Sequence, residues 1–418
     1  MATTEQVDAL VLGAGIVGLS TALHLVMRGR STVVVDLNGI AAGASFGNLG
    51  FVETSSIFPY AFPRKLGEMA RYALNQSPAA RFRWSSLPLI APTLARYWWH
   101  SGPRRYDRLA RTLAPLMLGS AEEHFLLARE AGLEHLYRPG GWLTIVSGER
   151  QHETAQAEIE RLRPFGVAPR YLYRKAVLAL EPMLGGDFTG AMHWKDAWTS
   201  SDPRGVVLGL ARRFEALGGR ILRGDARAIR QAGERWTLDT ETVRLSARDA
   251  IVALGSAAKT LVDQFGYRIP LAEKRGYHQM FAYPEGERLR LPVGNPGGGW
   301  AVVPLANGLR LGTGVEFAAA GAAPSYVQID RGEANARGFV ELGDRLTEKP
   351  WMGTRPFMPD MLPVIGPAPR HRGLWFGFGH AHHGFTLGPV TGRLLAEWIC
   401  DGAASIDIVA LSPRRFGA

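Results

Sequence analysis

The chain has 418 residues, of which 46% are hydrophobic and 21% are charged. This composition is typical of a soluble globular protein, and the length is enough for two domains with large hydrophobic cores. It excludes a disordered or fibrous protein. The formal net charge of +10 comes from arginines scattered along the sequence rather than from a basic block, so we expect no nucleic-acid partner.

Cysteine usage and the first residues predict the compartment. Cys400 is the single cysteine, which excludes an internal disulfide and fits a reducing environment. Residues 1–8 are polar and acidic, unlike the basic start of a secretory signal. No apolar run reaches the roughly 20 residues that a membrane helix needs. We therefore expect a cytoplasmic protein.

A segment rich in aromatic and basic side chains, residues 82–99, has two interpretations. Its tryptophans, with Arg104 and Arg105 just beyond, suit a membrane surface, and this predicts peripheral contact with the inner face of the cytoplasmic membrane. The other interpretation is a helical region that packs between domains and carries a solvated rim of arginines. We favour the packing interpretation and keep membrane contact as the alternative.

The first elements of the chain predict a dinucleotide site. An apolar strand at residues 9–12 runs into a glycine-rich turn at residues 13–18 and then a helix, and a second strand at residues 32–35 ends in Asp36. The glycines permit a tight turn and a close approach to a pyrophosphate, the helix N-terminus attracts the phosphates, and the carboxylate hydrogen-bonds a ribose. The predicted contacts are Gly13, Ala14, Gly15, Ile16, Val17, Gly18, Asp36 and Leu37.

Two further segments predict the rest of the cofactor site. The small-residue loop at residues 43–50 can lie against an extended cofactor. Far along the chain, a strand at residues 374–378 precedes a glycine-containing loop and a helix whose first position is Pro389. The dipole of that helix is expected to stabilise negative charge on the cofactor. The predicted contacts in these segments are Ala44, Ser45, Asn48, Leu49, Gly50, Gly384, Phe385 and Thr386.

Other strands depart from the alternation of strand and helix. Residues 298–303 and 309–313 flank Asn307-Gly308, which is a hairpin signal, and residues 141–146 form another strand. These strands predict an antiparallel sheet that forms a substrate domain over the cofactor.

In these motifs the chain resembles the D-amino-acid oxidase superfamily of flavoproteins, and within it the bacterial D-amino-acid dehydrogenase and glyphosate oxidoreductase branch. The likeness extends over nearly the whole chain, and the motifs are more specific for the superfamily than for a substrate. They are residues 43–48 (GASFGN), 275–278 (RGYH), 351–355, 359–366, 379–386 and 415–417.

The resemblance implies an α/β (α+β) fold, with a Rossmann-like FAD-binding domain interleaved with an antiparallel-sheet substrate domain. The FAD-binding domain is expected at residues 1–60, 185–262 and 353–418, and the substrate-binding domain at residues 61–184 and 263–352.

The resemblance also implies non-covalent FAD and no metal. Cys400, the one cysteine that could tether a flavin, falls late in the last helix. A central strand is expected near residues 227–229 and another at residues 250–255. Further FAD contacts are expected at Ala226, Gly255, Ser256, Gly379 and His380.

The resemblance assigns Arg355 to the substrate carboxylate, for which a guanidinium has bidentate geometry. With the carboxylate held, the Cα–H of a neutral amine leaves as hydride to flavin N5, and the imine hydrolyses to a keto acid. No acid or base is obligatory in this reaction. His380, His382 and His383 are candidates for polar lining or for tuning amine protonation, with His380 favoured because relatives share it. Tyr277 and His278 are further candidates for the pocket.

The predicted function is therefore oxidation of a D-amino acid or an N-substituted amino acid. An oxidase or dehydrogenase of the glycine, sarcosine, glyphosate or hydroxyproline type is one alternative, and a flavin-binding subunit without amine chemistry is another. Oxygen and a quinone are both open as the electron acceptor, as are the stereochemistry of the substrate and the oligomeric state.

Overall fold

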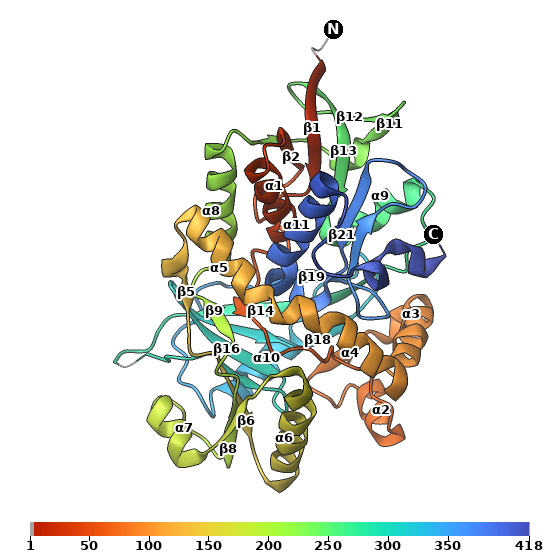
Figure 1. The fold of residues 1–418 in the computed structure, drawn as a ribbon. Coiled ribbons are helices and arrows are strands. Elements are labelled where there is room, and N and C mark those ends of the chain that lie inside the picture. Colours follow the sequence, from red (N-terminus) through yellow and green to blue (C-terminus); the bar gives the residue numbers. More distant parts are fainter. Residues whose placement is uncertain (1–3, 287, 418) are drawn as a thin grey trace.

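The computed structural model describes residues 4–286 and 288–417, and two main sheets organise it (Figure 1). In the first, the strand order is β10-β2-β1-β13-β12-β11, with β21 parallel to β13 and β20 antiparallel to β21. The strands around β1 are parallel, which confirms the Rossmann-like fold. The strands are β1 (Thr4–Leu12), β2 (Thr32–Asp36), β10 (Arg220–Arg223), β11 (Arg230–Ala232), β12 (Arg235–Asp239), β13 (Arg244–Val252), β20 (Val364–Pro367) and β21 (Leu374–Phe378).

The second sheet is largely antiparallel, as expected. Its order is β4-β18-β14-β17-β16-β15-β6-β8-β7, and β19 pairs with β14. The hairpin turns at Ala306-Asn307, which confirms the Asn-Gly signal. The strands are β4 (Ala80–Phe82), β6 (Leu143–Val146), β7 (Arg170–Tyr173), β8 (Gly190–His193), β14 (Ala272–Phe281), β15 (Val293–Asn295), β16 (Trp300–Leu305), β17 (Gly308–Thr313), β18 (Val315–Phe317) and β19 (Trp351–Phe357). A small third sheet contains β3 (Phe51–Val52), β5 (Tyr137–Arg138) and β9 (Trp198–Ser200).

The helices cover the first sheet and flank the second (Figure 1). Helices α1, α8 and α11 pack together beside the first sheet, and α5 packs against α8 and α11. The domain ranges stay a prediction, and β19 extends across the predicted boundary at residue 353. The helices are α1 (Ile16–Met27), α2 (Leu66–Ala73), α3 (Leu87–His100), α4 (Pro103–Leu118), α5 (Ser120–Ala131), α6 (Glu149–Leu162), α7 (Arg174–Leu180), α8 (Pro203–Ala216), α9 (Ala258–Gln264), α10 (Val327–Ala336) and α11 (Gly384–Asp401).

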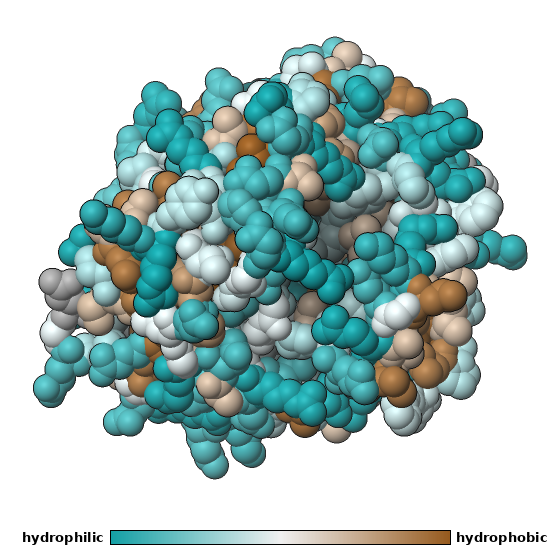
Figure 2. All heavy atoms as spheres, turned by 90° about the horizontal axis from the view of Figure 1, so that it is seen from below, coloured by the Kyte–Doolittle hydropathy of each residue, from teal (hydrophilic) through white to brown (hydrophobic). Residues whose placement is uncertain are grey.

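The surface is mostly hydrophilic on the face shown in Figure 2. Hydrophobic side chains gather at its right, the side on which Figure 1 places α2 and α3. Within the described part of the chain, no helix is both long and apolar enough to cross a membrane.

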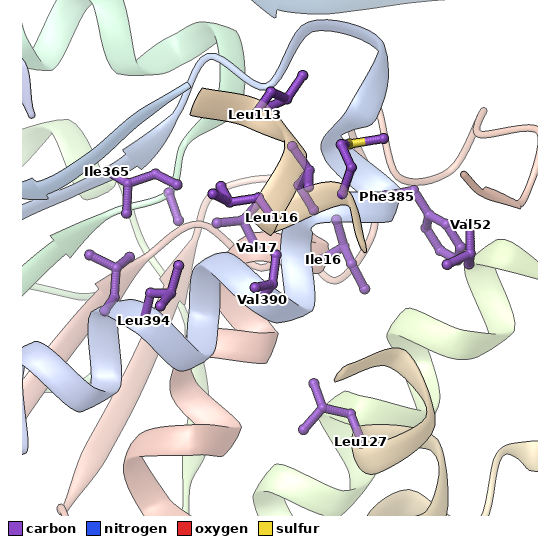
Figure 3. Packing of buried hydrophobic residues seen from close by; sticks show 14 of the residues in the cluster. Ile16, Val17, Val52, Leu113, Leu116, Leu127, Ile365, Phe385, Val390 and Leu394 are labelled. Atoms are coloured by element: carbon purple, nitrogen blue, oxygen red, sulfur yellow. The ribbon is translucent and has the colours of Figure 1, made fainter. Parts of the chain in front are cut away.

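Helices α1 and α11 come from opposite ends of the chain and pack in close contact. Figure 3 shows Ile16 and Val17 of α1 with Val390 of α11 in one buried cluster. A Cβ at Gly392 would lie only 2.6 Å from the backbone of Ser20, so the glycine is what allows the two backbones to approach. This approach places the two helix N-termini beside each other.

Two local expectations are wrong. Residues 226–228 form a 3₁₀ turn rather than a strand, because Asp225 accepts a hydrogen bond from the N–H of Arg227 and starts a turn there. Helix α11 begins at Gly384, so Pro389 lies inside it. A proline has no N–H to donate to the carbonyl of Phe385, and Nε2 of His124 hydrogen-bonds that carbonyl instead, at 2.9 Å.

Candidate active site

A cavity of about 690 Å³ runs from the glycine-rich turn of the first sheet to the face of β14 and β19 in the second. Its volume is within the range of cofactor and ligand sites. Of the predicted cofactor contacts, the following line it: Gly13, Gly15, Ile16, Val17, Asp36, Leu37, Ala44, Ser45, Asn48, Leu49, Ala226, Gly255, Ser256, Gly379, His380, Gly384, Phe385 and Thr386.

Three predicted contacts, Ala14, Gly18 and Gly50, do not line the cavity. The N–H of Ala14 donates to Oδ2 of Asp36 at 2.9 Å, so the carboxylate that ends β2 is tied to the glycine turn. Gly13 has a φ of +112°, and a Cβ at Gly18 would lie 1.9 Å from its carbonyl oxygen. The turn therefore depends on glycine at both positions.

Ser45 connects the small-residue loop to the start of α1. Its Oγ accepts a hydrogen bond from the N–H of Ile16 at 3.1 Å. The first turn of α1 contains no acidic residue. No carboxylate of that turn therefore neutralises the positive end of the helix dipole, which faces the cavity. This is the environment that a pyrophosphate requires.

The N-terminus of α11 borders the same cavity. Thr386 accepts from the N–H of Glu53 at 3.3 Å and donates to the carbonyl of Phe51 at 3.1 Å, which connects α11 to β3. Burial lowers the pKa of His124 to about 4. The ring is therefore neutral, and it can donate to Phe385 while Nδ1 accepts from the hydroxyl of Tyr137. These bonds hold the helix start in place.

The surroundings of His380 and His382, at this end of the cavity, favour the neutral form of both rings. His380 is buried and its Nε2 lies 2.9 Å from Oγ1 of Thr391. Burial lowers its pKa to about 3. The pKa of His382, which also lines the cavity, is lowered by burial and by the positive charges of Arg355 and Lys274. Neither ring adds positive charge at neutral pH.

Strands β14 and β19 form one wall of the cavity. Lys274 pairs with Arg355 and Gly276 pairs with Gly353, and all four line the cavity. The guanidinium of Arg355 lies over Gly276, where a Cβ would be 2.5 Å from Cζ. Burial lowers the pKa of Arg355. The structure thus brings Arg355, the predicted carboxylate ligand, to the cavity wall.

The other two predicted pocket residues do not line the cavity. Tyr277 is on the opposite face of β14, where its hydroxyl bonds Glu316 and Arg275 forms an ion pair with the same carboxylate. His278 is buried beneath Trp351, whose ring stacks on it with centroids 4.8 Å apart. These placements give no support to a substrate contact for either residue.

Lys274 is the main cavity residue that sequence reasoning missed. It is 3% exposed, and burial lowers its pKa to about 7, with a smaller effect from Arg355. Its position relative to Arg355 depends on the register of β14 and β19, which no local motif encodes. Glu53 was also missed, and it lines the cavity while paired with His383 at 3.5 Å.

The donor set fits an extended dinucleotide. Glycine backbone and a helix N-terminus suit the pyrophosphate, Asp36 suits the ribose, and the start of α11 suits an electron-rich ring system. Cys400 is not among the lining residues. The described residues contain no group of three or more His, Cys, Asp or Glu that could hold a metal ion.

Known proteins share this sequence pattern and this fold. A profile of the DAO family, described as FAD dependent oxidoreductase, matches residues 8–398. The D-amino-acid oxidase of Bradyrhizobium diazoefficiens is 30% identical over 423 residues, 97% of this chain and 98% of that protein. The D-amino acid dehydrogenase of Chromohalobacter salexigens is 28% identical over 98% of this chain and all 100% of that one. The crystal structure of glycine oxidase from Geobacillus kaustophilus has a TM-score of 0.73 at 20% identity, over 97% of this chain and 98% of that chain. The chain therefore belongs to the DAO family of FAD-dependent oxidoreductases.

Proposed function

We propose that this protein oxidises the CH–NH bond of a D-amino acid or an N-substituted amino acid. One observation carries the proposal: Arg355 is partly buried in the cavity wall, and its surroundings within the described residues supply no carboxylate to balance it. Removing a guanidinium from water is unfavourable unless an anion meets it. The carboxylate of an amino acid is such an anion, and it would be held bidentately.

The chain's own residues would orient the substrate. Bound FAD would supply the hydride acceptor at flavin N5. Arg355 would hold the carboxylate and so orient the Cα–H toward the bound cofactor, and the N-terminus of α11 would place its positive dipole end beside the ring system. Loss of a hydride and a proton converts the amine to an imine, and water converts the imine to a keto acid and ammonia or a primary amine.

The preference for a D-amino acid rests on the relatives, which are named D-amino-acid oxidase and D-amino acid dehydrogenase. The experiment is an anaerobic screen of flavin reduction over D-, L- and N-alkyl amino acids. We expect bleaching of the flavin absorbance by at least one amino acid and none by the matched amines that lack a carboxylate. If no amino acid bleaches the flavin, the protein is a flavin-binding subunit without amine chemistry.

We also propose that FAD is bound without a covalent link. Cys400 lies in the last turn of α11, outside the cavity, which removes the one cysteine as a tether. Acid or heat should therefore release yellow FAD into solution. Flavin that remains with the precipitated protein would contradict this proposal and would direct attention to the cavity histidines.

We further propose that the protein is cytoplasmic and gives its electrons to a quinone at the inner membrane surface. The surface formed by α2 and α3 exposes Leu66 by 84%, Leu89 by 74% and Trp99 by 54%. The guanidinium of Arg105 lies 3.9 Å from the centre of the Trp99 ring. Apolar and basic groups together suit an anionic bilayer surface.

Vesicle flotation tests the membrane contact. The protein should float with vesicles containing anionic lipid and should float less when Leu66 and Leu89 are replaced by serine. Replacement of Val409, which is exposed elsewhere, is the control. Rapid stoichiometric peroxide formation in air, faster than reduction of a quinone, would contradict the choice of acceptor.

A further inference from the structure

Two positive charges lie side by side in the cavity wall. Lys274 and Arg355 are direct partners in the antiparallel pairing of β14 and β19, so their side chains are on the same face of the sheet. Both line the cavity. Like charges directly opposite each other are destabilising, and here the destabilisation is increased because Lys274 is 3% exposed.

The nearby carboxylates are engaged elsewhere. Glu316 of β18 is on the face of the sheet opposite Lys274, where it pairs with Arg83 and Arg275. Glu53 is hydrogen-bonded to Ser56 and paired with His383. Among the described residues no carboxylate contributes to the electrostatic surroundings of Lys274 or Arg355. Within the described part of the chain, the two cations therefore lack a counter-ion.

Aromatic rings surround the Lys274 ammonium group. Its Nζ lies 4.0 Å from the ring centre of Phe357, 4.2 Å from that of Tyr97 and 5.5 Å from that of Phe317. Tyr97 and Phe317 also line the cavity. Ring faces attract a cation but provide no hydrogen-bond acceptor equal to an oxygen anion. The site is thus shaped to hold the ammonium group while its donors remain available to a ligand.

We propose that Lys274 binds a second acidic group of the substrate, so that the substrate is an amino acid with two anionic groups. Arg355 holds one carboxylate, and Lys274 holds a second carboxylate or a phosphonate on the side chain or on the amine substituent. This inference rests on the proposed function, since it assigns Arg355 to the first carboxylate. It makes Lys274 a specificity-determining residue.

The proposal predicts proton uptake when the second acid binds. An anion beside the amine favours its charged form, which raises the lowered pKa of Lys274. The other charged or titratable groups around it are Arg355 on β19, Tyr97 on α3 and His382 before α11. The pKa of His382 is lowered well below its usual value, burial raises the pKa of Tyr97, and an arginine guanidinium stays protonated in proteins. Lys274 is the one of these four groups expected to change charge around neutral pH.

The experiment measures binding of unreactive acids to the FAD-loaded protein. Dicarboxylates from malonate to adipate are compared with monocarboxylates of equal length by calorimetry and by perturbation of the flavin spectrum. The best dicarboxylate should bind wild type roughly thirtyfold more tightly than its monocarboxylate partner. Its binding above pH 7 should take up a proton, measured as a dependence of the heat on the buffer.

Lys274→Met should remove both the preference for dicarboxylates and the proton uptake, and Lys274→Arg should retain part of the preference. Lys259→Met, on an exposed lysine paired with Asp263, is the matched control and should behave as wild type. If Lys274→Met weakens both acids equally, the two cations grip one carboxylate and the proposal is wrong. The same holds if wild type shows no preference.

Because binding of unreactive acids requires no turnover, this result is independent of the flavin-reduction screen. Preference for dicarboxylates without flavin reduction by any amino acid would refute the proposed function and leave Lys274 as an anion ligand. Flavin reduction by neutral amino acids without preference for dicarboxylates would refute only the role of Lys274.

Discussion

The two ends of the cavity are built from different materials. The end proposed to bind the nucleotide is lined by glycine backbone, by the hydroxyls of Ser45 and Ser256 and by the carboxylates of Asp36 and Asp225. The substrate end is a sheet face on which two unbalanced cations, Lys274 and Arg355, lie opposite each other. Binding at the first end is spread over many modest contacts, whereas at the second it is concentrated in two charges.

The difference has an energetic meaning. A backbone N–H that faces a cavity large enough for water can bond to that water, so the end proposed to bind the nucleotide carries little penalty without its ligand. A guanidinium and an ammonium group held in a low-dielectric wall destabilise the protein until an anion arrives. The charges proposed to give specificity should therefore reduce the stability of the substrate-free protein.

Arg355→Met should produce the largest effect. Loss of one charge-assisted bidentate contact should cost about 3 kcal/mol, or roughly a hundredfold in kcat/KM for amino acids. FAD content should be unchanged, because the residue is at the substrate end. Arg372→Met, at an exposed arginine, is the control. If the variant has the kcat/KM of wild type, Arg355 does not bind the substrate carboxylate.

Lys274→Met should stabilise the substrate-free protein by about 2 kcal/mol at pH 7. The folded-state pKa of about 7 is below the unfolded value, so the unfolded chain binds more protons between these two values. Wild-type stability should therefore rise with pH above 7, and the advantage of the variant should shrink. Urea unfolding at pH 7 and at about pH 9.5 measures both. An advantage that is the same at both pH values would show that Lys274 titrates normally.

Asp36→Ala tests the nucleotide end, where a smaller loss is expected. The variant removes the acceptor for the ribose and the bond to the N–H of Ala14, and we expect FAD affinity to fall by about 2 kcal/mol, roughly thirtyfold. Fluorescence titration of the apoprotein measures the Kd. Asp239→Ala, at the exposed end of β12, is the control. An unchanged Kd would place the ribose elsewhere.

Ser45→Ala should have the smallest effect. Ile16 loses one neutral hydrogen-bond acceptor, which corresponds to about 1 kcal/mol or roughly fivefold in the Kd for FAD. Ser412→Ala removes a similar hydroxyl bond to backbone outside the cavity and should leave the Kd unchanged. A loss as large as that of Asp36→Ala would mean that the nucleotide end depends on a few groups, as the substrate end does.

The sequence is informative where the relevant residues are close along the chain. The turn at residues 13–18, Asp36 and the loop with Ser45 fall within the first 50 residues, and their spacing predicts their meeting. Arg355 is assigned through resemblance. Lys274 could not be predicted, because only the register of β14 and β19 sets it opposite Arg355.

Side chains alternate between the two faces of a strand, and this explains why Lys274 lines the cavity whereas Tyr277 does not. Lys274 and Tyr277 must be on opposite faces of β14, but local pattern does not say which face borders the cavity. The start of α11 is predicted at Pro389, but the helix begins at Gly384, and the reason is again a contact between distant residues. The carbonyl of Phe385, which Pro389 leaves without a helical N–H donor, is hydrogen-bonded by His124. His124 is distant in sequence and reaches this carbonyl because α5 packs against α11.

The close packing of α1 against α11 also determines when during synthesis the cavity can be completed. The turn at residues 13–18 leaves the ribosome well before α11, which Gly392 brings against Ser20. Translation adds about 5–20 residues per second, so the N-terminal strand and helix wait on the order of a minute or less without their partner. The complete cavity therefore cannot form on a nascent chain that lacks α11, and we expect loading with FAD to follow the synthesis of α11.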